Sequence, residues 1–181
     1  MAGVALLLSQ TNLLAQINLN WASSFSPSWG NGDLTGTASN IGGNSINCSA
    51  SFTMPGAGVF MPVLGSSGSQ SPSVSGAVFT VPGTTNRIQV TPNYNSNSSY
   101  TDILLSFSSM TTNISFRIVD IDKSDASSTT YFDRVTVTGS NGSSTFYPTL
   151  TKYDALTDPN FLIISSNAAQ VNTSSGQAGN T

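Results

Sequence analysis

The residues best suited to chemistry are four aspartates in one short polar segment, between two runs that look like strands. They are half of the chain's eight acidic residues, and they are Asp120, Asp122, Asp125 and Asp133. Ca²⁺ takes roughly 6–8 oxygen ligands, and carboxylates are among the groups it prefers. Asp120 and Asp122 share one strand face because they are two positions apart, and Asp133 opens the returning run. The pattern allows a Ca²⁺ site formed by these four aspartates.

The same aspartates also have a purely structural interpretation. The segment is not an EF-hand loop, which needs Gly at its sixth position and Glu at its twelfth. Counting from Asp120, those positions hold Asp125 and Tyr131. Aspartates at strand ends often cap turns, and the segment carries basic side chains with which they can pair. Turn capping and ion pairing therefore stay open beside metal binding.

Aromatic side chains next to polar ones form a second candidate site. Tyr94 and Tyr100 flank the run NSNSS, and Trp29 follows the run ASSFSPS. A flat ring packs on the apolar face of a sugar, while neighbouring amides and hydroxyls bond its hydroxyl groups. We predict Trp21 as a core residue, because it alternates with aliphatic residues. Trp29, Tyr94 and Tyr100 are the predicted ligand-binding residues.

Composition excludes several kinds of chemistry. The chain has no His and one Cys, Cys48, so a His-based triad, a His-ligated zinc site and an internal disulfide are excluded. Cys48 belongs to an apolar series with Ile46, Ala50 and Phe52 that alternates with polar residues, which predicts a small core residue. Paired carboxylates suit a glycosidase, but nothing in the sequence supplies the apolar pocket that tunes a general acid. We predict that the protein is not an enzyme, and a polysaccharide-active enzyme or accessory module is the weakest alternative.

The charge and residue content indicate a β protein with many turns. Only 7% of residues are charged, against roughly 25% in ordinary soluble proteins. The net charge of −3 and the five basic residues provide no electrostatic surface for nucleic acid. All acidic residues are Asp, and Ser, Thr, Asn and Gly, which favour turns and caps, are abundant.

Short apolar alternations separated by turn residues predict an all-β fold. We expect an antiparallel β-sandwich of jelly-roll or lectin-like type with about ten short strands. Asn141-Gly142 predicts a type I′ hairpin turn, and residues 64–76 and 92–100 are predicted loops. The predicted strands lie near residues 17–21, 45–53, 59–63, 77–81, 87–91, 101–107, 113–121, 132–138, 144–150 and 161–165.

The N-terminal segment differs from the remainder. Residues 1–16, MAGVALLLSQTNLLAQ, are predicted as the remnant of a secretory signal peptide, although they lack a positively charged start. The apolar runs are too short to span a bilayer, so we predict no transmembrane segment. Residues 17–181 are predicted as a single β-sandwich domain.

Three stretches of the chain carry a resemblance to a known group of proteins. The matching residues are Leu14-Ala15-Gln16, Leu19 to Trp21, Phe116, Ile118, Asp120, Ile121, Asp122, Asp133, Val135 and Val137. On these residues the chain resembles a β-sandwich domain of exported, adhesin-like surface proteins of Bacteroidota-type bacteria, which are passengers of type IX secretion. The resemblance implies surface display, adhesion or glycan contact. Such domains continue with two further strands, so it also implies that the last strands are lacking here.

Together these patterns predict a secreted, extracellular module at the cell surface that binds a glycan or another surface ligand. Ca²⁺ at the acidic segment is the only cofactor the residues suggest. The alternative is a structural spacer or a self-assembling surface subunit without a small ligand. The oligomeric state stays open.

Overall fold

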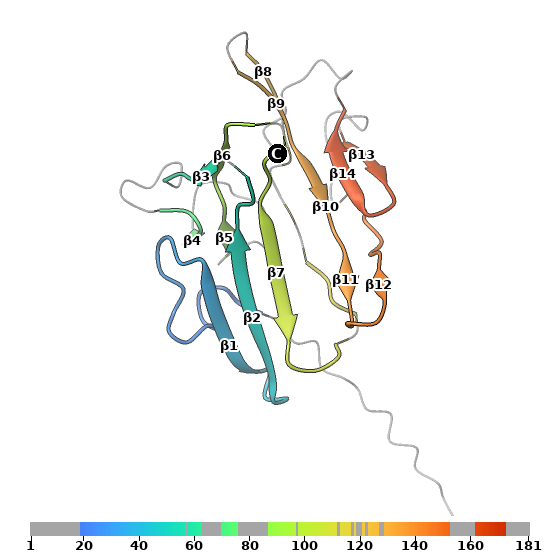
Figure 1. Cartoon of the computed structure of the whole chain (residues 1–181). Helices are drawn as coiled ribbons and strands as arrows, with labels where there is room; N and C mark the ends of the chain where they lie inside the picture. Colours follow the sequence, from blue (N-terminus) through green and yellow to red (C-terminus); the bar gives the residue numbers. More distant parts are fainter. Residues whose placement is uncertain are drawn as a thin grey trace, which may run out of the picture. The chain divides into compact units, whose positions relative to one another are not determined.

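The computed structural model shows a chain built from antiparallel strands (Figure 1). It describes residues 19–56, 58–62, 70–75, 87–96, 98–111, 113–116, 118, 121, 123–126, 129–152 and 162–172. Every regular element in these ranges is a strand, which confirms the all-β prediction. The predicted signal remnant, residues 1–16, lies outside the described residues.

The described part of the chain contains no helix that is long and apolar enough to cross a membrane.

Two compact units make up the chain, with the boundary between Thr111 and Thr112. We call them unit 1 and unit 2, and each is described by itself. The expectation of one domain over residues 17–181 stays a prediction.

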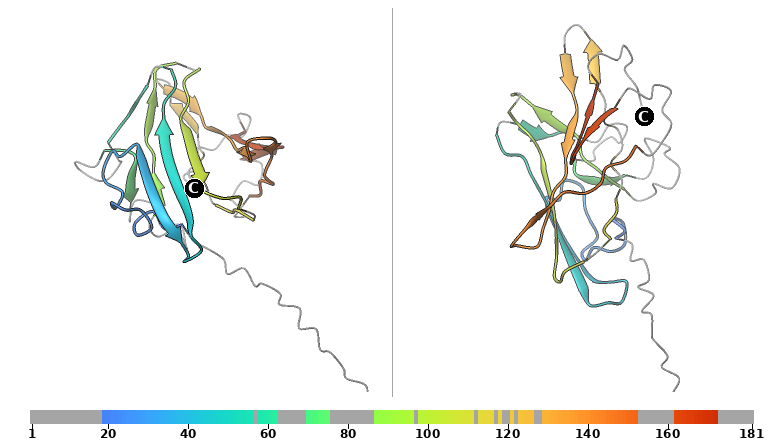
Figure 2. Two further views of the ribbon diagram at one scale, coloured as in Figure 1. Left: turned by 60° about the horizontal axis from the view of Figure 1, so that its bottom comes forward. Right: turned by 90° about the vertical axis from the view of Figure 1, so that its right-hand side faces the viewer.

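Unit 1 is organised around a three-stranded sheet with the order β1-β2-β7, which Figure 2 shows from two further directions. Two pairs of short strands, β3 with β6 and β4 with β5, complete its described elements. The strands are β1 (Thr35–Ile41), β2 (Ile46–Thr53), β3 (Gly58–Phe60), β4 (Ser73–Ser75), β5 (Arg87–Gln89), β6 (Pro92–Tyr94) and β7 (Asp102–Phe107).

The central strand β2 has one buried face, as its alternating sequence predicts. Cys48, Ala50 and Phe52 are buried, while Asn47 and Ser49 are exposed and Ser51 is half-buried. Successive side chains of a strand point to opposite faces, so the three apolar residues form one stripe. The prediction of Cys48 as a core residue is confirmed. Burial raises the pKa of its thiol.

An aromatic cluster covers this stripe. Trp21 stacks on Phe25 with ring centroids 5.0 Å apart, and Phe25 meets Trp29 edge to face at 5.1 Å. Trp29 then meets Phe52 edge to face at 5.4 Å. Aromatic pairs prefer such stacked and edge-to-face arrangements, which each add about 0.5–1.5 kcal/mol to the free energy gained by burial. The segment before β1 thus supplies three of the four aromatic side chains of this cluster.

One glycine of β1 makes this packing possible. A Cβ atom at Gly36 would lie 2.6 Å from Cζ3 of Trp29 and 3.0 Å from Cδ1 of Phe25. Two carbon atoms in contact normally sit about 3.5–4.0 Å apart. The Trp29 ring therefore rests on bare backbone, which only glycine provides at this position.

Several element boundaries of unit 1 differ from expectation. Strand β1 was not predicted, and β4 and β6 lie in the segments predicted as loops 64–76 and 92–100. Residues 19–21, predicted to end a strand, adopt irregular and turn structure instead. Short edge pairs depend on neighbours far away in the sequence, so alternation within a segment does not reveal them. The predicted strand 77–81 lies outside the described residues.

Unit 2 contains a second three-stranded sheet with the order β10-β14-β13, and two hairpins, β8-β9 and β11-β12. All of these pairings are antiparallel. The strands are β8 (Lys123–Ala126), β9 (Thr129–Phe132), β10 (Arg134–Thr136), β11 (Gly139–Ser140), β12 (Thr145–Phe146), β13 (Leu162–Ser165) and β14 (Ala168–Val171).

In the segment with the clearest alternation, the described residues do not form the predicted strand. Within 113–121, the described residues 113–116, 118 and 121 all lie outside strands, and Asn113 has a φ of 57°. Ile114 and Phe116 are exposed. A strand needs a hydrogen-bonded neighbour as well as an alternating sequence, and none of the described residues there is paired.

The hairpin turn after β11 forms where the sequence predicts it, but with a different backbone. A type I′ turn needs positive φ at both central residues. Gly142 has a φ of 86°, whereas Asn141 is not among the described residues with positive φ. The Asn141 Oδ1 atom instead accepts hydrogen bonds from the backbone amides of Ser143 and Ser144 at 3.0 and 2.9 Å. The asparagine side chain thus stabilises a four-residue loop.

Candidate functional site

The acidic segment contains a β-hairpin rather than an open loop. Strand β8 pairs with β9 so that Asp125 lies opposite Thr130, and only two residues join the strands. Asp133 is half-buried, and its carbonyl oxygen accepts a hydrogen bond from the backbone amide of Val171 at 3.2 Å. Asp120 and Asp122 lie outside the described residues.

This placement leaves the Ca²⁺ site of Asp120, Asp122, Asp125 and Asp133 as a prediction. Within the described ranges, no group of three or more His, Cys, Asp or Glu residues is arranged to hold a metal ion. Asp120 and Asp122 lie outside these ranges, and the side chain of Asp125 is not among the described ones either.

Trp29, a predicted ligand-binding residue, is part of the core. Only 7% of its surface is exposed, and its ring contacts Trp21, Phe25 and Phe52. A ring enclosed in this way offers no face to a sugar. We therefore leave Trp29 out of the candidate site and assign it to the hydrophobic core.

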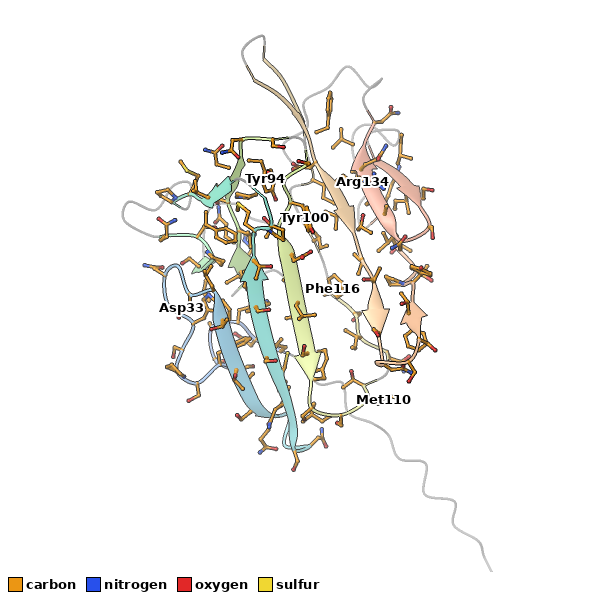
Figure 3. All side chains as sticks on the ribbon, in the orientation of Figure 1. Asp33, Tyr94, Tyr100, Met110, Phe116 and Arg134 are labelled. Carbon is orange, nitrogen blue, oxygen red and sulfur yellow. The ribbon has the colours of Figure 1, made fainter. Side chains whose placement is uncertain are left out.

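Tyr94 and Tyr100 both lie on the surface of unit 1, at the two ends of the loop that joins β6 to β7 (Figure 3). Their exposed fractions are 41% and 52%. The Tyr94 hydroxyl lies 2.8 Å from Oγ1 of Thr101, a hydrogen bond that ties the end of β6 to the residue after Tyr100. This bond brings the two ends of the loop together.

The loop between the two tyrosines has its own polar network. The Ser96 hydroxyl lies 2.7 Å from the Ser98 hydroxyl and accepts a hydrogen bond from the Ser98 amide at 3.1 Å. The Ser99 amide donates to the Ser96 carbonyl, also at 3.1 Å. Two exposed rings beside ordered hydroxyls are the arrangement that the sequence predicts at this loop. We call Tyr94, Tyr100 and the serines between them the tyrosine loop.

Unit 2 presents a second candidate surface, which the sequence reasoning missed. Residues opposite one another in a sheet point to the same side. Arg134 of β10 lies opposite Gln170 of β14, which lies opposite Ile163 of β13. These three side chains therefore form one row across the sheet, and all three are exposed. Arg134 is labelled in Figure 3.

The neighbouring rows show that the sheet is amphipathic. The next row, Val135, Ala169 and Ile164, points to the opposite side and is buried or half-buried. The row after it places Ser165 beside Ala168 on the same side as Arg134. One face of the β10-β14-β13 sheet is thus apolar, and the other carries mixed polar side chains.

The polar face is hollowed. An open depression of about 320 Å³ lies over it, and the described residues that line this depression all belong to unit 2. We call it the sheet hollow. Its lining residues are Arg134, Ile163, Ser165, Asn167, Ala168 and Gln170.

Asn167 fixes one end of the sheet hollow. Its side-chain Nδ2 donates to the Val137 carbonyl at 2.9 Å, and the Val137 amide donates to the Asn167 carbonyl at 2.8 Å. The side-chain Oδ1 of Asn167 remains as an acceptor. Because two hydrogen bonds hold this residue, the turn between β13 and β14 is set against the end of β10.

The sequence contains a weak pattern that indicates one strand of this surface. Leu162 and Ile164 alternate with Ile163 and Ser165, which is typical of a strand with two different faces. Strand β14 has only Ala and Val as apolar residues, and the pairing that brings Arg134 beside Gln170 is not visible in either segment alone.

No known protein family, curated protein or solved structure matches the chain significantly.

Proposed function

We propose that the protein is a secreted, extracellular binding module of a cell surface, and that it contacts carbohydrate. The observation that carries this proposal is the exposure of Tyr94 and Tyr100 at the two ends of one polar loop. The proposed architecture is a β-sandwich of jelly-roll or lectin-like type. It acts by binding rather than by catalysis.

The tyrosine loop supplies both kinds of contact that a sugar needs. An exposed tyrosine ring buries the apolar C–H face of a pyranose, while hydroxyl and amide groups bond its hydroxyls. The hydrogen bond between Tyr94 and Thr101 limits the motion of one ring. A ring that is held before binding loses less conformational entropy when the ligand arrives.

The test is a screen of the purified chain against neutral oligosaccharides, followed by calorimetric titration of the best ligand. Tyr100→Ala is expected to weaken binding about tenfold, which corresponds to roughly 1.4 kcal/mol of lost contact. Tyr100→Phe keeps the ring and should retain most of the affinity. Tyr147→Ala removes an exposed tyrosine from unit 2, outside the tyrosine loop, and is the matched control.

Equal loss of binding in Tyr100→Ala and Tyr147→Ala would contradict the role of the tyrosine loop. Absence of any glycan ligand, together with oligomers that grow with protein concentration, would favour the self-assembling structural subunit. That alternative draws support from β7, which ends the sheet of unit 1 and exposes the apolar side chains of Ile103 and Leu104.

A further inference from the structure

The sheet hollow combines a cation, neutral polar groups and one apolar side chain on a single sheet face. Arg134 and Gln170 are directly opposite on adjacent strands, and Ile163 continues their row. Directly opposite residues have Cβ atoms about 4.5–5.5 Å apart, so Gln170 is a near neighbour of both Arg134 and Ile163. A ligand that lies over Gln170 can therefore contact all three side chains.

Arg134 is the charged group of this surface. Within the described part of the chain, its guanidinium makes no hydrogen bond or ion pair. A guanidinium presents five N–H donors in a planar fork that matches a carboxylate with two parallel hydrogen bonds. The ligand group that best complements an Arg134 side chain without a protein partner is thus a planar anion.

The other lining residues restrict the chemical class of the ligand further. Ser165 and Gln170 provide donors and acceptors, and Asn167 keeps Oδ1 as an acceptor for a hydroxyl. Ile163 adds an apolar patch, which an inorganic anion does not use but the C–H face of a sugar ring does. The net charge of −3 disfavours a nucleic acid or another highly charged polyanion.

We propose that the sheet hollow binds a carboxylate-bearing sugar residue of uronic-acid type, with Arg134 pairing with the carboxylate. Gln170, Ser165 and Asn167 then bond ring hydroxyls, and Ile163 packs against the ring. The inference rests on the proposed carbohydrate function and names the class of sugar. It also adds a second binding surface, on unit 2, to the tyrosine loop of unit 1.

The experiment titrates the full chain with a single galacturonic acid residue capped as its methyl glycoside, which carries one carboxylate, and, in parallel, with the methyl ester of the same compound, which has the same ring without the charge. The acid form should bind and the ester should bind at least tenfold more weakly. Arg134→Gln should weaken binding of the acid form about tenfold or more, since hydrogen bonds to charged groups contribute roughly that factor. Arg134→Lys should recover only part of the affinity, because lysine keeps the charge but loses the fork.

Lys152→Gln is the matched control, because it removes one exposed positive charge of unit 2 outside the sheet hollow. It should change the affinity less than twofold. Added salt should weaken the acid form at this exposed site, because mobile ions screen the attraction. The thermal midpoints of all variants verify that they are folded. Equal effects of Arg134→Gln and Lys152→Gln, or equal binding of acid and ester, would overturn the inference.

The two proposals fail in distinguishable ways. Binding of neutral glycans that depends on Tyr100, with no effect of Arg134→Gln on the acid form, removes the sheet hollow and keeps the proposed function. Binding of the acid form that depends on Arg134, with no effect of Tyr100→Ala on any glycan, keeps the sheet hollow and removes the tyrosine loop. Competition by inorganic sulfate or phosphate as strong as that by free galacturonate would identify a general anion site and overturn the assignment to a sugar.

Discussion

In unit 1, seven hydrophobic side chains are buried in one cluster, whereas in unit 2 only Ala169 and Val171 reach that state among the described residues. Unit 2 instead exposes large apolar side chains, among them Phe116, Phe146 and Tyr147. Burial of apolar surface contributes roughly 25 cal/mol per Å² to folding. The described elements of unit 1 are therefore stabilised by an aromatic core, and those of unit 2 depend more on strand pairing.

Because of this difference, the residues that stabilise unit 1 are distinct from the surface residues that are candidates for binding. The buried aromatic residues of unit 1 pack against one another in the core, so the Trp29 ring is not accessible to a ligand. In unit 2 the polar face of the sheet carries none of the core, so its side chains are free to serve binding.

The largest expected effect comes from emptying the core of unit 1. Phe52 has 1% of its surface exposed, and Phe52→Ala should lower the free energy of unfolding by about 3–5 kcal/mol. Phe146→Ala in unit 2, where 52% of the side chain is exposed, should change it by less than about 0.5 kcal/mol. Urea unfolding followed by circular dichroism measures both changes. Similar losses in the two variants would remove the contrast between the units.

A smaller effect is expected from adding a single methyl group. Gly36→Ala places a Cβ against the Trp29 ring and should cost about 1–3 kcal/mol, since overpacking forces the ring or the strand to move. A Cβ at Gly139 of unit 2 meets nothing closer than 3.8 Å, so Gly139→Ala should change stability by less than about 0.5 kcal/mol. Both tryptophans belong to unit 1, so their fluorescence reports the movement directly. An unchanged spectrum in Gly36→Ala would show that the ring does not rest on this glycine.

The smallest effect is a dependence on alkaline pH that arises from the buried thiol of Cys48 in unit 1. Burial raises the pKa of the Cys48 thiol above its ordinary value of 9.0, so the unfolded chain loses this proton at a lower pH than the folded chain. The contribution of the buried neutral thiol is complete below pH 9.0 and declines as the pH rises above it. The stability difference between the wild type and Cys48→Ala should therefore shrink in that range. Unfolding midpoints of both chains at neutral and alkaline pH measure it, and a constant difference would contradict the effect.

The sequence predicted those elements whose pattern is local. Strands β2 and β7 appear close to their expected positions, because the alternation in INCSASF and DILLSF matches the two faces of a sheet. Strand β1 was missed because TGTASNI has only Ala38 and Ile41 as apolar residues. Its place is determined by the turn that follows it and by its pairing with β2.

Of the two candidate surfaces, the sequence likewise predicts the one whose pattern is local and misses the other. Exposure of Tyr94 and Tyr100 follows from their position on a polar loop, which the sequence shows directly. The sheet hollow depends on a register that joins Arg134 to Gln170 and Ile163, three residues from separate segments. Such a register is a property of the folded chain, so no short pattern in the sequence contains it.

The alternating rows of the β10-β14-β13 sheet have a consequence for how this protein can change over evolutionary time. Every second residue of the three strands lies on the side of the sheet that carries the sheet hollow, and the residues between them lie on the apolar side. Substitutions at Arg134, Gln170 or Ser165 therefore alter the proposed binding surface without opening a void on the other side. In a sheet with this division, residues of the polar face can be replaced, and the ligand preference changed, with little loss in the free energy of unfolding.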